Sequence, residues 1–343
     1  MALEVDAARK LVETALGPGR RTVRPFGAGK FSDVFAVDGD DGHYVLRVAP
    51  PDTVRQLFYE RRMMRQEPAL HARLRTETSV PVPDITFHDF SRVRIDRDWL
   101  IMPRLPGVPL SRAALHTAAR HRALEQWGRY VAQIHALTDP AGRFGYLGEH
   151  DCMIPQPSWA EAFAVMVARE LDDIVDCGVF ERSEADAAVR LLRDNLAAFD
   201  HGTSSRLLHG DLWVTNLLVD PDGQTGQPPG TVAGMLDFDR ACWGDVEWDL
   251  AIAEYCGVTS PPFWRGYQAE CRQLGLEDCA EARARIGTDA GQLRRMFYLL
   301  YEHAKYIVIR VSSRHDDPAA AQRYARDCRT VLDNFRRTGR PAF

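Results

Sequence analysis

Two short segments in the second half of the chain carry the residue types that phosphoryl transfer needs. The first is residues 208–216, which read LHGDLWVTN, and the second is residues 236–239, which read LDFD. Asp211 offers a carboxylate that can accept or orient a hydroxyl, and positioning matters most because the transition state is loose. Asn216 and Asp237 offer the hard oxygen atoms that Mg²⁺ prefers. The two segments predict Asp211 as the catalytic residue and Asn216 and Asp237 as metal ligands.

Three further polar residues stand in or near these segments. His209 precedes the loop aspartate and is expected to brace the loop rather than to do acid–base work. Asp239 either supports the metal ligands or is a solvated neighbour. Asp249 follows at the start of a predicted helix, where a carboxylate is expected to accept hydrogen bonds from loop backbone. The alternative, two acidic turns in an unrelated α/β protein, is disfavoured because a glycine-rich loop also lies upstream.

That glycine-rich loop is residues 27–32, which read GAGKFS between two predicted strands. It is not a phosphate loop of the GxxxxGK type, because position 24 is an arginine instead of a glycine. Gly27 and Gly29 can nevertheless bring the backbone close to nucleotide phosphates. The alternative is an ordinary hairpin, and the acidic segments downstream favour the nucleotide-binding interpretation.

Arg47 is the candidate phosphate-binding cation. It lies on a predicted strand, residues 43–48, and a guanidinium can bridge phosphate oxygens and a carboxylate. A surface arginine on an alternating strand is the alternative. Glu67 is its proposed partner, with Glu60 as the competitor about two turns earlier. The sequence leaves the choice between them open.

Several elements must position these residues. Hydrophobic spacing and turn residues predict strands at 22–26, 43–48, 84–88 and 99–102, and a polar hairpin at 220–230. Helical patterns cover 3–16, 53–76, 113–137, 158–200 and the chain from 244 onward. Because Pro68 disfavours helical geometry at the residue before it, we expect a kink or a helix restart near Glu67.

Composition narrows the class of protein. A chain of 343 residues with a hydrophobic fraction of 45% can bury a large core in two lobes. The net charge of −5 gives no basic field for nucleic acid or an anionic membrane. The N-terminal residues lack a secretory pattern, and no window is apolar enough for a membrane span. The seven cysteines have no CxxC spacing and predict buried thiols in a reducing, cytoplasmic setting.

At this point the chain resembles the aminoglycoside phosphotransferase family of the protein-kinase-like superfamily. The resemblance covers roughly residues 20–255 and rests on the two acidic segments together with 27–35, 46–48 and 100–107. It implies an α+β, bilobal protein-kinase-like fold. Residues 1–103 would form a nucleotide-binding lobe with an antiparallel sheet, and residues 104–343 a larger, mostly helical lobe.

The resemblance also implies where the nucleotide base binds. A hinge near residues 102–107 would join the lobes, with the carbonyl of Pro103 and the N–H of Leu105 pairing with the base. Arg47 stands where the superfamily commonly has a lysine, so the geometry of the phosphate contact is left open.

The implied activity is a Mg²⁺-dependent transfer of the γ-phosphoryl group of ATP or GTP to an alcohol. An antibiotic or related natural product is the expected acceptor, and the enzyme would act in resistance as a monomer or homodimer. The alternatives are a metabolic or repair kinase of a sugar or fructosamine, and a nucleotide-binding pseudokinase. Trp213 gives the catalytic loop a fructosamine-kinase-like context. Any of the lobe's tryptophans that is not core could stack on a substrate ring (Trp159, Trp243, Trp248 and Trp264).

Overall fold

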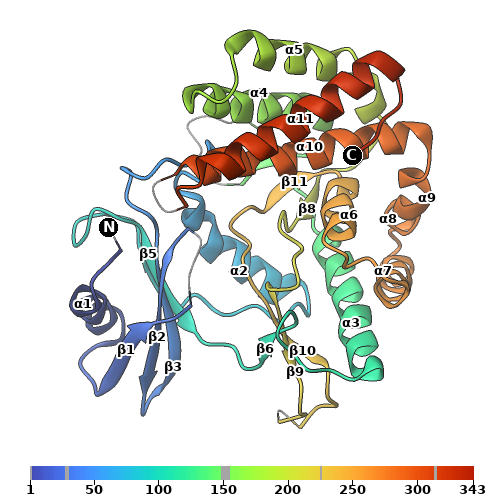
Figure 1. Ribbon diagram of the computed structural model, residues 1–343. Helices are drawn as coiled ribbons and strands as arrows, with labels where there is room; N and C mark the ends of the chain where they lie inside the picture. The colour runs from blue at the N-terminus through green and yellow to red at the C-terminus, as the bar shows by residue number, and fades with distance from the viewer. Residues whose placement is uncertain (1, 28–30, 148–154, 225, 313–314) are drawn as a thin grey trace.

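The computed structural model describes residues 2–27, 31–147, 155–224, 226–312 and 315–343. Figure 1 shows a sheet-rich N-terminal region in blue to cyan, and a mostly helical region in green to red. Within the described residues, no helix is both long enough and apolar enough to cross a bilayer.

The N-terminal region is built on one antiparallel sheet. Its five strands have the order β1-β2-β3-β5-β4. They are β1 (Arg21–Pro25), β2 (Asp33–Gly39), β3 (Gly42–Val48), β4 (Phe87–Asp89) and β5 (Trp99–Pro103). Helix α1 (Val5–Leu16) buries Leu11 and Val12 against this sheet. The strands and the first helix lie where the sequence predicts them, within a few residues at each end.

The predicted helix over 53–76 is wrong in its first half. Residues 53–62 form turns and irregular backbone, a 3₁₀ helix covers Met63–Gln66 (η1), and the α-helix begins only at Glu67 (α2, Glu67–Glu77). The consecutive side chains of residues 57–60 are all buried, a pattern that a single-faced helix cannot satisfy. Arg62 then adopts a left-handed φ of 61°. The predicted restart near Glu67 is confirmed, with Pro68 in the first turn, where it is tolerated.

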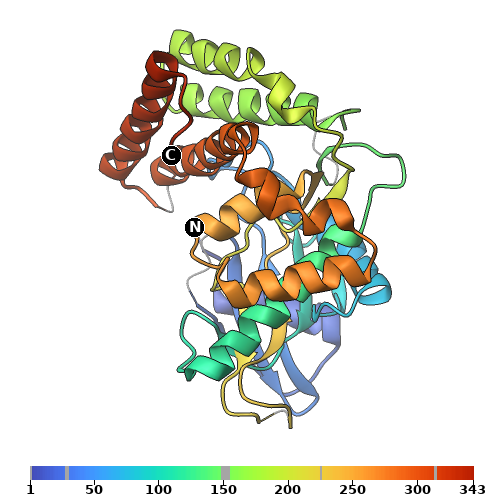
Figure 2. The ribbon, with the colours of Figure 1, turned by 90° about the vertical axis from the view of Figure 1, so that its right-hand side faces the viewer.

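The C-terminal region is a helical bundle around two small sheets. The helices are α3 (Thr117–Ala136), α4 (Trp159–Asp176), α5 (Arg182–Arg193), η2 (Leu196–Phe199), α6 (Val246–Tyr255), α7 (Pro261–Gln273), α8 (Glu277–Ala280), α9 (Ala282–Ile286), α10 (Asp289–Val311) and α11 (Pro318–Thr338). Helices α3 and α7 lie against each other, as Figure 2 shows in teal and orange. Glycines permit this contact, because a Cβ at Gly128 would lie 2.2 Å from the Phe263 carbonyl oxygen.

The two small sheets carry the acidic segments. One has the order β10-β9-β6 and the other β7-β11-β8. Their strands are β6 (Val108–Pro109), β7 (Gly145–Tyr146), β8 (Arg206–Leu208), β9 (Leu217–Asp220), β10 (Thr231–Met235) and β11 (Cys242–Gly244). Strands β9 and β10 pair antiparallel from Thr231 opposite Asp220, so the predicted polar hairpin is confirmed. The segment 209–216 therefore connects β8 to β9, and 236–241 connects β10 to β11.

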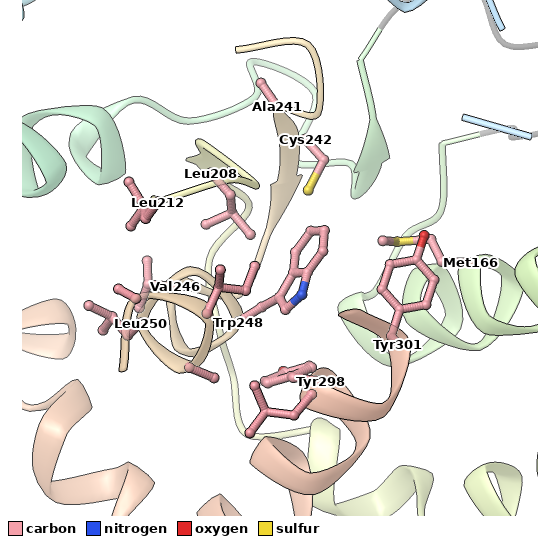
Figure 3. Packing of buried hydrophobic residues seen from close by; sticks show 14 of the residues in the cluster. Met166, Leu208, Leu212, Ala241, Cys242, Val246, Trp248, Leu250, Tyr298 and Tyr301 are labelled. Carbon is pink, nitrogen blue, oxygen red and sulfur yellow. The ribbon is translucent and has the colours of Figure 1, made fainter. Parts of the chain in front are cut away.

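A large apolar core packs against the two connecting segments, 209–216 and 236–241. Trp248 and Leu250 of α6, Leu208, Leu212, and Tyr298 of α10 belong to one buried cluster, part of which Figure 3 shows. The same cluster also includes Leu57 and other apolar side chains of the segment 57–82, so the first lobe is anchored directly to the second. The division at residue 103 stays a prediction, since the hydrophobic contacts run across it.

Candidate active site

The loop between β8 and β9 brings Asp211 and Asn216 into contact. The Asn216 side-chain amide donates to the backbone oxygen of Asp211 at 3.0 Å and to its carboxylate Oδ2 at 2.8 Å. Because Nδ2 is used in this way and Oδ1 has only a long contact of 3.5 Å with the Thr215 hydroxyl, Oδ1 is the atom that can face a cation. The Asp211 side chain is 31% exposed, so its carboxylate can meet a substrate hydroxyl. The five-residue spacing thus folds into one turn with both groups at its rim.

Two backbone contacts fix this loop to the second acidic segment. The N–H of Leu236 donates to the Asn216 carbonyl at 2.9 Å. The buried ring of His209 spans the same two segments: the Asp211 N–H donates to Nδ1 at 3.2 Å, and Nε2 lies 3.1 Å from the Leu236 carbonyl. The ring proton therefore sits on Nε2 and is donated to that carbonyl. Burial lowers the pKa of His209, which suits a neutral brace. These contacts are those expected of His209 as a residue that braces the loop.

Asp249 holds the start of the same loop. This fully buried carboxylate on α6 accepts the N–H of His209 at 2.7 Å and the N–H of Gly210 at 2.8 Å. The ring nitrogen Nε2 of His135 lies 3.2 Å from Oδ2. Although burial opposes it, the hydrogen bond with His135 holds the pKa of Asp249 below its usual value. The expectation that Asp249 serves loop backbone is confirmed.

We expect Asp249→Ala to lower the free energy of unfolding by about 3 kcal/mol or more, because it strands two buried backbone donors. Urea unfolding followed by fluorescence measures the change. Asp249→Asn is the matched control, since its amide oxygen keeps one acceptor and should cost less. Equal stability of the alanine variant and the unchanged chain would contradict the role given to Asp249.

Asp237 begins the second acidic segment in an unusual backbone conformation. Its φ is 68°, a left-handed value that is costly for a non-glycine residue and is typical of functional sites. Its side chain is exposed. Partial desolvation and the negative charge of Asp239 raise the pKa of Asp237 above its usual value. The site concentrates negative charge that a cation would balance.

The donor set fits Mg²⁺, since Asn216 and Asp237 both present oxygen atoms at the junction of the two segments. A bound Mg²⁺ would supply positive charge to the nucleotide phosphates. The chain's own contribution is to hold Asp211 beside Asn216, so that a hydroxyl accepted by Asp211 faces the same place. These roles remain predictions, although the predicted residues lie together.

Arg47 lies between the two lobes. Its Nη1 donates to Glu67 Oε2 at 2.7 Å, and its Nη2 contacts Asp239 Oδ1 at 2.9 Å and Oδ2 at 2.7 Å. The structure thus selects Glu67 over Glu60 as the partner of Arg47. Asp239, which the sequence left as a supporting group or a solvated neighbour, is a buried ion-pair partner. Although burial alone would lower it, the charges of Asp239 and Glu67 raise the pKa of Arg47.

Glu60 has a different environment from Glu67. It is buried and accepts the Leu57 N–H at 2.9 Å. Burial raises its pKa from 4.5 to about 7. The folded chain therefore binds an extra proton between these two pH values, and stability must fall as the pH rises through that window.

We expect Glu60→Gln to be more stable than the unchanged chain by up to about 3 kcal/mol at pH 8, with the difference vanishing near pH 4.5. Glutamine keeps an acceptor for the Leu57 N–H but carries no charge. Unfolding free energies at the two pH values measure the effect. A difference that is the same at both would show that Glu60 ionises normally in the fold.

The remaining predicted nucleotide contacts are Gly27 and Gly29 after the first strand and Pro103 and Leu105 at the hinge. Gly27 has a φ of 73° at the end of β1, where a glycine is favoured, while Gly29 lies outside the described residues. Phe31, beyond the glycines, makes an edge contact with His315, with ring centroids 6.4 Å apart. Phe31 thus contacts the C-terminal lobe.

The predicted hinge residues lie where the first sheet ends. Pro103 is the last residue of β5 and stands opposite Tyr44 of β3. Leu105 follows in the connection to β6, and a Cβ at Gly234 would meet its side chain at 2.6 Å. Base binding by Pro103 and Leu105 stays a prediction.

Sequence reasoning missed a charged group beside Asp211. Arg240 Nη1 lies 4.0 Å from Asp211 Oδ1, and Glu302 of α10 holds the guanidinium with two contacts at 3.2 and 3.3 Å. The hydroxyl of Tyr59 accepts a third hydrogen bond at 3.1 Å. Lys305 of α10 pairs with the same glutamate. Arg240 directly follows the second acidic segment, but nothing in the sequence marks it as a neighbour of Asp211, and Glu302 and Lys305 carry no local signal.

The tryptophans divide into core and surface. Trp159, Trp248 and Trp264 are buried, so their rings stabilise the fold. Trp243 is half-buried beneath the guanidinium of Arg73. Trp213, two residues after Asp211, is 39% exposed. It is therefore the tryptophan whose ring can meet an acceptor.

Comparison with known proteins gives three results. A model of the phosphotransferase enzyme family matches residues 22–285. A probable ketoamine kinase of Vibrio cholerae is 30% identical over 206 residues, which are 57% of this chain and 62% of that protein. The chain thus spans about three fifths of this relative's length.

Solved structures show the same fold at low identity. A putative fructosamine-3-kinase of Haemophilus somnus has a TM-score of 0.63 at 16% identity, covering 94% of this chain and 97% of that one. Aminoglycoside phosphotransferase APH(4)-Ia, solved with AMP-PNP and hygromycin B, has a TM-score of 0.58 at 19% identity with the same coverage. The predicted protein-kinase-like, α+β fold is confirmed.

Proposed function

The chain belongs to the APH family of phosphotransferase enzymes, and on this premise we propose that it phosphorylates a hydroxyl on the sugar of a ketoamine. A ketoamine is a sugar that carries an amine substituent beside its carbonyl group. The phosphoryl donor is ATP or GTP, with Mg²⁺ as the cofactor. Asp211 is the proposed catalytic residue, and Asn216 and Asp237 are the proposed metal ligands.

One observation supports phosphoryl transfer as the reaction. Asp211 and Asn216 are hydrogen-bonded at 2.8 Å, and the carbonyl of Asn216 is tied to Leu236, directly before Asp237. A protein that only bound nucleotide would need no exposed carboxylate in this position. The site therefore supports a kinase over a pseudokinase.

The acceptor is proposed from the relatives. The antibiotic acceptor expected from the sequence has support from fold likeness alone, since APH(4)-Ia is 19% identical. The alternative, a sugar or fructosamine kinase, is favoured by the relative of Vibrio cholerae, a probable ketoamine kinase at 30% identity. The exposed ring of Trp213 beside Asp211 suits the apolar face of a sugar.

A substrate screen tests this proposal. The chain is incubated with Mg²⁺ and either ATP or GTP against fructosyl amines, against fructose and the free amines separately, and against aminoglycosides. We expect a mass gain of one phosphate on the fructosyl amines. A gain on the aminoglycosides alone would replace the ketoamine with an antibiotic. No transfer to any acceptor, with no nucleotide consumed, would contradict a kinase.

Other parts of the proposal concern the setting of the enzyme. We infer a cytoplasmic protein that acts on a small molecule, without nucleic acid or membrane partners. A monomer or a homodimer satisfies the site equally, because all of its residues come from one chain. Base recognition by Pro103 and Leu105 and phosphate binding by Gly27, Gly29 and Arg47 complete the proposed nucleotide site.

A further inference from the structure

The guanidinium of Arg47, which is proposed to bind phosphate, already contacts two protein carboxylates. Both oxygens of Asp239 contact Nη2 of Arg47, at 2.9 and 2.7 Å, while Glu67 takes Nη1 at 2.7 Å. The two carboxylates come from different lobes, because Glu67 opens α2 and Asp239 follows β10. Arg47 is therefore a bridge between the lobes.

The arginine side chain makes this bridge possible. A planar guanidinium offers donors in a fixed fork and can serve two carboxylates on separate nitrogens. A lysine ammonium is a compact charge and would not hold the same geometry. Arg47 and Asp239 thus form a matched pair, and the pair explains why an arginine suits this position.

Asp239 takes the place that a phosphate oxygen would take on Nη2. It is buried, and both of its carboxylate oxygens accept hydrogen bonds from the Arg47 guanidinium. It also lines a small cavity whose other walls, among them Ser32, Glu60 and Met64, come from the first lobe.

Displacing Asp239 from Arg47 has a cost. A phosphate that took Nη2 would leave a buried carboxylate without its cation, close to the carboxylate of Asp237, and such groups are strongly destabilising. A second positive charge removes this cost. A divalent cation beside Asp237 would balance the negative charge of Asp239 when Arg47 exchanges this carboxylate for a phosphate.

We propose that Asp239 is an internal counter-anion of Arg47 that makes nucleotide binding depend on the divalent cation. The inference rests on the proposed nucleotide site and adds a positioning role for Asp239, which the phosphoryl-transfer motif does not assign. Without the divalent cation, the ion pair between Asp239 and Arg47 stays intact, and Arg47 contributes little to the binding of the phosphates.

The unchanged chain provides the first test. Titration calorimetry with Mg²⁺ removed by EDTA compares ADP with adenosine, and GDP with guanosine. If Asp239 occupies Arg47, the nucleotide and its nucleoside should bind within about threefold of each other. A nucleotide that binds more than about tenfold tighter than its nucleoside without metal would overturn the proposal.

The second test compares two variants that each remove one carboxylate charge, one beside Arg47 and one in the hairpin between β9 and β10. In EDTA, Asp239→Asn should bind ADP or GDP about tenfold to a hundredfold tighter than the unchanged chain, which is the range of a charge-assisted hydrogen bond. Its gain from Mg²⁺ should shrink accordingly. Asp222→Asn is the control, because it removes an exposed carboxylate from the hairpin between β9 and β10 and leaves Asp239 on Nη2, and we expect a change below about threefold.

The outcomes separate this inference from the proposed function. Metal-free affinity that is unchanged or weaker in Asp239→Asn would overturn the inference, and so would an equal gain in Asp222→Asn. Tight binding of Mg²⁺ with ADP or GDP to the unchanged chain would still support the nucleotide site in either case. Failure of both nucleotides to bind with Mg²⁺ would instead overturn the proposed function.

Discussion

Replacing Asp211 by alanine should lower kcat by about three orders of magnitude while leaving the Kd for Mg²⁺–nucleotide within a few-fold of its original value. The carboxylate is 31% exposed near the start of the catalytic loop, where it can orient a hydroxyl. Its removal leaves the backbone contacts of the loop intact, because these involve His209, Asn216 and Leu236. Steady-state kinetics with the best ketoamine and calorimetry with ADP measure the two quantities.

Two controls make this result specific. Asp211→Asn keeps a carbonyl oxygen for the Asn216 amide but cannot take a proton, so it should lose activity nearly as fully as alanine. Asp222→Ala removes an exposed carboxylate in the polar hairpin between β9 and β10, and its turnover should be unchanged. Full turnover in Asp211→Ala would remove this residue from the mechanism and with it the spacing argument for residues 208–216.

The catalytic loop could be predicted because its residues are close in sequence. Asp211 and Asn216 lie five positions apart in one turn, and the hairpin at 220–230 returns the chain to Asp237. Short-range geometry of this kind leaves few alternatives. The helix-start position of Asp249 also predicted its hydrogen bonds to loop backbone, as the contacts with His209 and Gly210 confirm.

The charged neighbours of the site could not be predicted in the same way. Asp239 and Arg47 are 192 positions apart, and Arg240 and Glu302 are 62 apart. Such pairs form only when whole lobes and helices pack, and nothing in the local pattern marks Glu302 as facing an arginine. Lys305 is one of three lysines in the chain, which set it apart by type but not by location.

The helix prediction for the segment before α2 was wrong for a related reason. Residues 57–60 are buried because they pack into the core of the other lobe, which overrides any local helical preference. The helix therefore starts at Glu67, and this start places the Glu67 carboxylate against Arg47 at 2.7 Å. The packing of this segment therefore explains both the shorter helix and the position of the Glu67–Arg47 ion pair.

Asp237→Ala should remove most of the gain in nucleotide affinity that Mg²⁺ provides, a loss on the order of 100-fold when a metal contact of several kcal/mol is removed. Asn216 alone offers one neutral oxygen, which binds a divalent cation weakly. Calorimetry with ADP or GDP, with and without Mg²⁺, measures the loss. Metal-dependent binding that survives in the variant would exclude Asp237 from the metal site.

The backbone of Asp237 supplies a control that alanine alone cannot. At a φ of 68°, alanine keeps the strain of a side chain in the left-handed region, whereas glycine relieves it. Asp237→Gly should therefore be more stable than Asp237→Ala by about 1 kcal/mol, yet equally deficient in metal-dependent nucleotide binding. If the glycine variant regained binding along with stability, the defect of alanine would come from backbone strain. If both variants stay deficient, the missing carboxylate is the cause, and the strained conformation serves to present that carboxylate beside Asn216.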